Sequence, residues 1–215
     1  MELLTGVVGP LATNVYIVAD PATHEAIAVD TATPSVEWLV ANLARLGWRL
    51  KLVVSTHGHW DHIGDNAAVQ EQTGAPIAVH PFDRGRLERP RADFAPFPIP
   101  PSYPAVELAE GGRIDLGALR LEVLHTPGHT EGSTCLLERD GGILLTGDTL
   151  FKAGWGRTDL PGGNDEQMAD SLARLSRLAT EMGACRVLPG HGRATTLADE
   201  KPWLDLVAQE GRLIA

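Results

Sequence analysis

The chain has 215 residues, a hydrophobic fraction of 43% and a formal net charge of -10. This length can bury a core without disulfides, and no apolar run reaches the ~20 residues that a membrane-spanning helix needs. The negative charge opposes binding to phosphate backbones. We therefore expect a soluble globular protein with neither a nucleic-acid nor a membrane partner.

Two short strands and a helix are predicted in the first quarter of the chain. Residues 15–20 and 26–30 are β-branched runs bounded by turn residues. Residues 33–47 carry apolar side chains at helical spacing, with Thr33 able to cap the first turn and Pro34 suited to the first helical position. This pattern predicts a helix packed against a sheet.

A third strand is predicted at 50–56, a short helix from about Asp65 to Gln72, and a further strand that ends at His80. The loop directly after the strand contains the stretch HGHWDH, and ligand sites of α/β sheets gather at such strand ends. Residues 81–105 hold seven of the fifteen prolines, so no regular element is expected there. Two interpretations stay open for this segment: a packed crossover loop, or a lid whose arginines and aromatics select substrate.

The second half of the chain predicts four strands and two helices. The first helix, from about Asp165 to Met182, has Asn164 and Gln167 placed as in a capping box. Two successive strand-rich halves favour an α/β fold in which two sheets stack as a sandwich with helices outside, forming a single domain over residues 1–215. The predicted strands are 119–125, 133–138, 142–147 and 185–190, and the terminal helix is 199–213.

The two cysteines and the N-terminus point to the same compartment. Cys135 and Cys185 lie in or beside apolar strands, which favours buried free thiols over a disulfide. The first residues lack the basic start and long apolar core of a secretory signal, so we expect a cytoplasmic protein. The sequence carries no signal for an oligomeric state.

Three of the eight histidines, His57, His59 and His62, fall within six positions, with Asp61 between them. In an extended loop alternate residues point the same way, so His57 and His59 can hold one ion while Asp61 and His62 face a neighbouring one. One loop can thus serve two metal ions.

More donors are expected elsewhere, because each ion wants about four ligands. His129, Asp148 and His191 each follow a predicted strand and lie beside a glycine. Singly, each is more often a loop residue or a turn former, but together with the cluster they predict a binuclear site. Histidine and carboxylate donors suit zinc, iron and manganese, with zinc as our first expectation.

The remaining candidates have weaker support. Asp30 ends a predicted strand and can orient a metal ligand from behind, or only cap the next turn. His24 is expected on the surface, His80 in a structural role, and His125 as a packing residue able to reach a ligand from behind.

The motifs HGHWDH, TPGHT, GDTLF and LPGHG resemble the metallo-β-lactamase superfamily, and the match is ordered over residues 14–192, most of the chain. The resemblance implies a four-layer αβ/βα sandwich of two mixed β-sheets with the metals at the sheet edges. Within the superfamily, GDTLFKAGWGRTDLPGG followed by a helix and LPGHG is similar to short, single-domain glyoxalase II-like hydrolases, the hydroxyacylglutathione hydrolases. This similarity implies three sets of donors: His57, His59 and His129 for the first ion, Asp61, His62 and His191 for the second, and Asp148 with a hydroxide as bridges.

The implied activity is a metal-dependent thioesterase that uses a metal-bound hydroxide, with Asp61 orienting the hydroxide. Its substrate would be a small thioester. In the longer glyoxalase II enzymes a lysine and an aromatic hydroxyl hold glutathione, whereas the matching positions here are Arg157 and Asp159. Arg157 is therefore the predicted substrate-binding residue, and both the thiol and the acyl group stay open.

Other members of the superfamily offer alternatives. A persulfide dioxygenase would use mononuclear iron held by His57, His129 and Asp148, and a lactone hydrolase could share all seven donors. A β-lactamase usually has a cysteine where this chain has Asp148, and the net charge opposes an RNA-cleaving enzyme. A non-catalytic binding module is disfavoured because no donor position is lost, and the complete second set with His191 favours a hydrolase.

Overall fold

A computed structural model describes residues 1–91 and 95–214 of the chain. Residues 92–94, within the segment predicted to be irregular, and residue 215 lie outside this description. Within the described part, no helix is long and apolar enough to cross a membrane.

The first sheet has six strands in the order in which they occur in the chain. The first three strands pair antiparallel, and the strands from β3 to β6 run parallel. They are β1 (Glu2–Val8), β2 (Thr13–Asp20), β3 (Glu25–Val29), β4 (Arg49–Val54), β5 (Ile77–Val79) and β6 (Val106–Glu107).

The second sheet also has six strands, in the order β12-β11-β10-β9-β8-β7. It is mixed as well, because β10 and β11 pair parallel while the other neighbours pair antiparallel. Its strands are β7 (Arg113–Leu116), β8 (Leu119–His125), β9 (Thr134–Glu138), β10 (Ile143–Gly147), β11 (Arg186–Pro189) and β12 (Thr195–Thr196).

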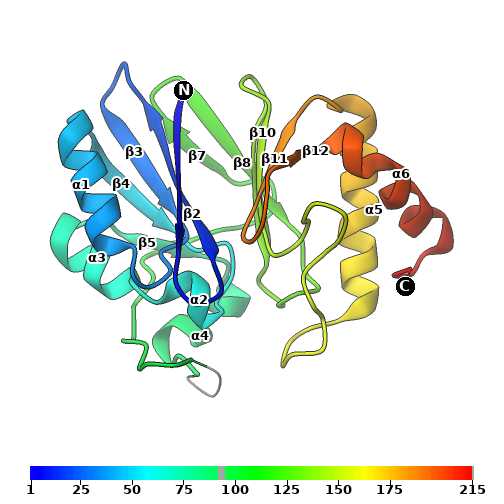
Figure 1. Cartoon of the computed structure of the whole chain (residues 1–215), viewed down its shortest axis with the longest axis horizontal. Coiled ribbons are helices and arrows are strands. Elements are labelled where there is room, and N and C mark those ends of the chain that lie inside the picture. Colours follow the sequence, from blue (N-terminus) through cyan, green and yellow to red (C-terminus); the bar gives the residue numbers. More distant parts are fainter. Residues whose placement is uncertain (92–94, 215) are drawn as a thin grey trace.

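Helices cover the outer face of each sheet, so the protein has four layers (Figure 1). Helices α1 (Val36–Leu46) and α3 (Asn66–Thr73) lie on the first sheet, and α5 (Asp165–Glu181) and α6 (Leu197–Glu210) on the second. Three short helical segments lie at the lower edge in this view: α2 (Trp60–Ile63), η1 (Pro81–Asp83) and α4 (Arg84–Glu88). The predicted sandwich of two mixed sheets with helices outside is confirmed.

Strand β2 explains how the layers are held together. Its side chains alternate, with Tyr16 and Val18 in the core between the two sheets and Ile17 and Ala19 in the core beneath the helices. A strand that is apolar on both faces reads as a continuous hydrophobic run, which is why it was predictable. Side chains of both sheets meet in the central core.

The N-terminal end of α1 differs from the prediction. The helix begins at Val36, with Ser35 in the N-cap position, so Thr33 is not the cap. The acceptor comes from a distant residue: the Asp65 carboxylate accepts the backbone N–H groups of Ser35 (2.6 Å) and Val36 (2.9 Å). Local sequence signals cannot report a cap supplied by tertiary contact.

Two further predictions were incomplete. Residues 81–88 form η1 and α4, so the segment 81–105 is not irregular throughout, although its high proline content predicted this. Strands β1, β6, β7 and β12 were not predicted, since three of them are four residues or shorter and β1 is a partly exposed edge strand. The predicted helix over 65–72 and the buried free cysteines are confirmed.

Replacing Asp65 with alanine is expected to lower the free energy of unfolding by about 1–3 kcal/mol, because the α1 N-terminus and the Thr33 hydroxyl lose their buried acceptor. Urea denaturation followed by circular dichroism measures the change. Glu37→Gln, at an exposed carboxylate in the first turn of the same helix, is the control and should shift the value by less than about 0.5 kcal/mol. Equal effects of the two substitutions would contradict this account of the cap.

Candidate metal centre

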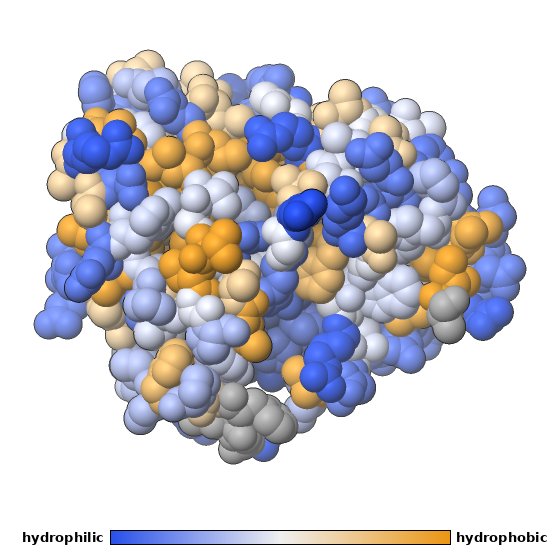
Figure 2. Space-filling view, viewed as in Figure 1, coloured by the Kyte–Doolittle hydropathy of each residue, from blue (hydrophilic) through white to orange (hydrophobic). Residues whose placement is uncertain are grey.

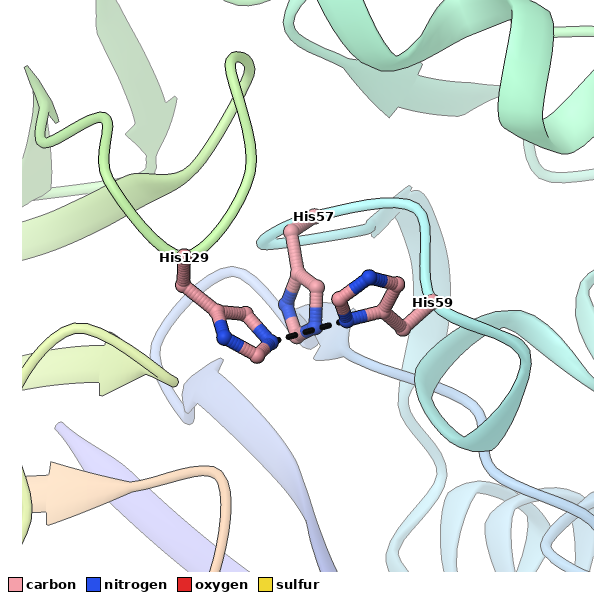
Figure 3. A group of neighbouring side chains, drawn as sticks. All are labelled: His57, His59 and His129. Atoms are coloured by element: carbon pink, nitrogen blue, oxygen red, sulfur yellow. Dashed lines mark hydrogen bonds between the residues drawn. The ribbon is translucent and has the colours of Figure 1, made fainter. Parts of the chain in front are cut away.

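Three histidines converge at the edge where the two sheets meet. His57 and His59 lie in the loop between β4 and α2, and His129 lies in the loop after β8 (Figure 3). His59 Nδ1 is 2.8 Å from His129 Nε2, and the centroid of the His57 ring is 4.9 Å from that of His59 and 4.8 Å from that of His129. These residues could hold one metal ion between them.

A second group lies beside the first. Asp61 and His62 belong to the short helix α2, which the loop enters directly after His59, and His191 follows β11. His191 Nε2 is 3.2 Å from both Asp61 Oδ2 and His62 Nε2. This group could hold a second ion.

Asp148, in the turn after β10, lies between the two groups. Its Oδ2 is 3.4 Å from His129 Nε2 in the first group, and its Oδ1 is 3.4 Å from His62 Nε2 in the second. One carboxylate therefore faces both groups, as a bridging ligand would. The structure thus brings all seven predicted donors to one place.

The donor set fits divalent metal ions. Four tetrahedral ligands at 2.0–2.1 Å from an ion lie about 3.3 Å from one another, close to the donor separations given above. Among the described residues, the buried His57 Nε2 and Asp148 Oδ1 lack a hydrogen-bond partner, a costly arrangement unless a cation accepts their lone pairs. A Cβ at Gly190 would lie only 2.2 Å from Asp148 Oδ1, so glycine is needed beside the donors.

The ring nitrogens that face away from the donor cluster are also engaged. The Nδ1 atoms of His129 and His191 donate to the backbone carbonyls of Arg157 (2.6 Å) and Leu11 (3.1 Å). A proton on Nδ1 leaves Nε2 with a free lone pair, which is the tautomer that a metal ligand requires.

The Asp30 carboxylate is the partner of the outward-facing ring nitrogen of His62. Its Oδ2 lies 2.8 Å from His62 Nδ1, and its two oxygens accept hydrogen bonds from the Thr56 backbone N–H (2.8 Å) and hydroxyl (2.9 Å). Asp30 has a φ of 58°, a strained conformation for a non-glycine residue. The carboxylate thus joins the start of the histidine loop to His62, as one of the two open interpretations of Asp30 predicts.

Charges within the cluster favour a cation. Burial lowers the pKa of His59 to about 3 and that of His57 well below its usual value, and the neighbouring histidines add to both shifts. Burial also lowers the pKa of His62, but Asp148, Asp61 and Asp30 outweigh it and raise the pKa to about 10. In the absence of metal, the cluster therefore keeps a proton on His62 that a divalent ion would replace.

The side chains of the other candidates contact residues outside the donor cluster or lie in solvent. His24 is exposed, as predicted, and His80 stacks on His125 with ring centroids 4.0 Å apart. The Arg157 side chain is 62% exposed and pairs with Asp159 at 2.6 Å. Its predicted role in substrate binding stays a prediction.

Several residues that shape the site were not identified from the sequence. Thr56 and Leu11 act through a hydroxyl, an amide and a carbonyl, which no spacing rule reports. Asp83, whose carboxylate accepts the Gly58 N–H at 2.7 Å, lies in the segment predicted to be irregular.

Sequence comparison matches residues 8–191 to the Metallo-beta-lactamase superfamily, which is most of the chain. The chain belongs to this superfamily. It is similar to an uncharacterized protein of Aquifex aeolicus, with 36% identity covering 90% of this chain and 91% of that protein. It is also similar to the hydroxyacylglutathione hydrolase of Thermosynechococcus vestitus, with 37% identity covering 78% of this chain and 60% of that enzyme.

Three solved structures share the fold. The B3 metallo-beta-lactamase BLEG-1 superposes with a TM-score of 0.85 at 29% identity, covering 94% of this chain and 99% of its own. ETHE1 from Myxococcus xanthus gives 0.79 at 31% identity, with 97% and 85% coverage. TTHA1623, solved in a di-iron-bound form, gives 0.79 at 34% identity, with 92% and 96% coverage.

Zinc binding by the metal-free protein is expected to release at least about one proton near pH 7, because His62, with a pKa of about 10, is protonated there. The zinc affinity should rise about tenfold per pH unit between pH 6 and 8. Isothermal titration calorimetry in buffers of different ionisation enthalpy measures both. The His24→Ala protein should behave like the wild type, and binding without proton release would contradict the assigned charge state.

The Asp30→Asn protein is expected to bind one of two zinc equivalents about 10- to 100-fold more weakly, because His62 loses the anion that fixes its ring. Competition with a chromophoric chelator resolves the two equivalents. Asp115→Asn, which changes an exposed carboxylate on β7, provides the control. Unchanged binding in the Asp30 variant would leave Asp30 with only the turn-capping role.

Proposed function

We propose that this chain is a binuclear metal-dependent hydrolase that cleaves thioesters of small hydroxyacyl or related acids. The observation that carries the proposal is the convergence of Asp61, His62 and His191 beside the three-histidine group, with Asp148 facing both. The similarity to hydroxyacylglutathione hydrolases supports the substrate class. Residues 1–215 would act as one domain, since side chains of both sheets share one core.

Two divalent ions bound there would lower the pKa of a shared water to near 7 and polarise the substrate carbonyl. Zinc is the proposed metal, and the di-iron form of TTHA1623 makes iron the first alternative, ahead of manganese. A thiolate leaves readily because its conjugate thiol has a pKa near 8.5, so the protein need not supply a strong acid.

Asp61 is the proposed catalytic residue. Burial alone would raise the pKa of its carboxyl, but His62 and His191 have the larger effect and hold this pKa well below its usual range, so the group stays ionised. An ionised carboxylate accepts a hydrogen bond from the attacking water and turns its lone pair toward the substrate. The buried His62 and the half-buried His191 on either side hold Asp61 in that direction.

Two other reactions have support from particular neighbours. The likeness to BLEG-1 makes β-lactam hydrolysis a candidate, and the likeness to ETHE1 makes persulfide oxidation by a single iron another. A single-iron site built on His57, His129 and Asp148 would leave Asp61 and His191 without a metal to bind. The close approach of both residues to His62 therefore favours the binuclear hydrolase.

The decisive test is hydrolysis of S-D-lactoylglutathione by protein loaded with two equivalents of zinc. We expect turnover that falls at least about 100-fold in the Asp61→Ala protein, because the variant loses both a metal ligand and the acceptor for the water proton. Asp115→Asn, at an exposed position on β7, should retain full activity.

The same preparation separates the alternatives. Hydrolysis of a lactone or of nitrocefin in preference to the thioester would move the assignment to that substrate class. Absence of all three activities in fully loaded protein would contradict the hydrolase proposal. The iron-loaded protein would then be tested for oxygen uptake with glutathione persulfide.

A further inference from the structure

The helical segment formed by η1 and α4 places one buried carboxylate beside the three-histidine group. Asp83, the last residue of η1, is fully buried, and its backbone N–H donates to the His80 carbonyl at 2.9 Å. Its side chain is turned away from solvent, between the loops that carry the three-histidine group. A buried carboxylate is costly unless donors surround it, so its partners indicate why it is there.

Asp83 accepts hydrogen bonds from both loops of the three-histidine group. Its Oδ2 accepts the backbone N–H of Gly58 and the hydroxyl of Thr130, each at 2.7 Å. Gly58 separates His57 from His59, and Thr130 directly follows His129. One oxygen atom therefore joins the backbone between two members of the group to the neighbour of the third.

The packing around this oxygen leaves little freedom. A Cβ at Gly58 would lie 2.6 Å from Arg86 Cβ, and a Cβ at Gly132 would lie 2.7 Å from Asp83 Cγ. Both loops thus approach the segment 81–88 more closely than any residue with a side chain could. The distance between the loops is set by the segment on which they both rest.

Arg86 supplies the charge that the buried carboxylate needs. Its Nε donates to Asp83 Oδ1 at 3.0 Å, and its Nη2 donates to the Pro161 carbonyl at 2.8 Å and to Glu131 Oε2 at 3.3 Å. Pro161 lies in the loop that follows Asp148, so the ion pair reaches a third part of the site's surroundings. Two neutral donors and one guanidinium thus surround the buried Asp83 carboxylate.

We propose that Asp83 is a positioning residue that sets the geometry of His57, His59 and His129, acting through the Gly58 amide and the Thr130 hydroxyl. The inference rests on the proposed use of these histidines as metal ligands. Asp30 contacts His62 of the second group directly, whereas Asp83 contacts only the neighbours of the first group's histidines. Asp83 therefore acts on the first group without touching the second.

The test is a titration of metal-free protein with cobalt(II), followed by its visible absorption, in competition with a chromophoric chelator. Asp83→Asn replaces one acceptor oxygen with an NH2 group, which must face either Arg86 Nε–H or the Gly58 and Thr130 donors, so the amide cannot satisfy all three. We expect one cobalt equivalent to bind about 10- to 100-fold more weakly and its ligand-field bands to change, while the other equivalent stays within about twofold of wild type.

A second pair of variants guards against a protein that does not fold. Thr130→Val removes only the hydroxyl donor and should weaken the same equivalent to a smaller extent, whereas Thr130→Ser should restore it. Asp20→Asn is the matched control, because Asp20, the last residue of β2, is a buried carboxylate that also accepts two backbone N–H groups. It should lower the midpoint of thermal unfolding without changing either binding constant.

Equal weakening of both equivalents in the Asp83→Asn and Asp20→Asn proteins would reduce Asp83 to a structural residue and overturn the proposal. Unchanged binding in Asp83→Asn and Thr130→Val would overturn it as well. Wild-type protein that binds only one equivalent would contradict the binuclear function, yet a selective loss of that equivalent in Asp83→Asn would still support the positioning role. Failure of the two proposals can thus be distinguished without any activity measurement.

Discussion

The apolar contact between the two sheets is the interaction on which the site depends. Strands β2, β3 and β4 of the first sheet and β8, β9 and β10 of the second bury alternate side chains in one shared core. This contact holds two separate sheets face to face, so that the loops after β4, β8, β10 and β11 open toward the same place (Figure 1). Without it, no local part of the chain would bring more than four of the seven donors together.

The hollow between the two halves of the molecule also follows from the contact between the sheets. Figure 2 shows hydrophilic residues along the hollow between the two halves, with hydrophobic residues gathered mainly over the first-sheet half. The rings of His57, His59 and His129 meet edge to face there, because the core fixes the strands that carry their loops. Their lone pairs converge on one place, where a divalent cation would accept them.

A carboxylate and two backbone carbonyls behind the donors fix the orientation of the histidine rings. Asp30 fixes His62 from the first sheet, the Leu11 carbonyl fixes His191 from the β1–β2 turn, and the Arg157 carbonyl fixes His129. Each contact selects a tautomer and aims a lone pair inward. Since these supports come from separate segments, each substitution would first disturb the orientation of one histidine.

Much of the site could be read from the sequence because the donors carry their own signal. The spacing of His57, His59, Asp61 and His62, and the placement of His129, Asp148 and His191 after strands, depend only on local chain order. The strands themselves were predictable where they are buried on both faces, as β2, β9 and β10 are. A continuous run of apolar residues predicts a strand that is buried on both faces, whatever its neighbours in the fold.

Only the tertiary structure decided the contacts that join distant segments. The Asp65 cap of α1, the Asp30 support of His62 and the burial of Asp83 beneath two loops each link residues at least 25 positions apart. Edge strands such as β6 and β12 form because a neighbour is present, and their two-residue sequences carry no pattern. The sequence by itself determined which donor side chains the chain could offer. The packing of the two sheets decided which other side chains hold those donors in position, because hydrogen bonds between distant segments exist only after the core has formed.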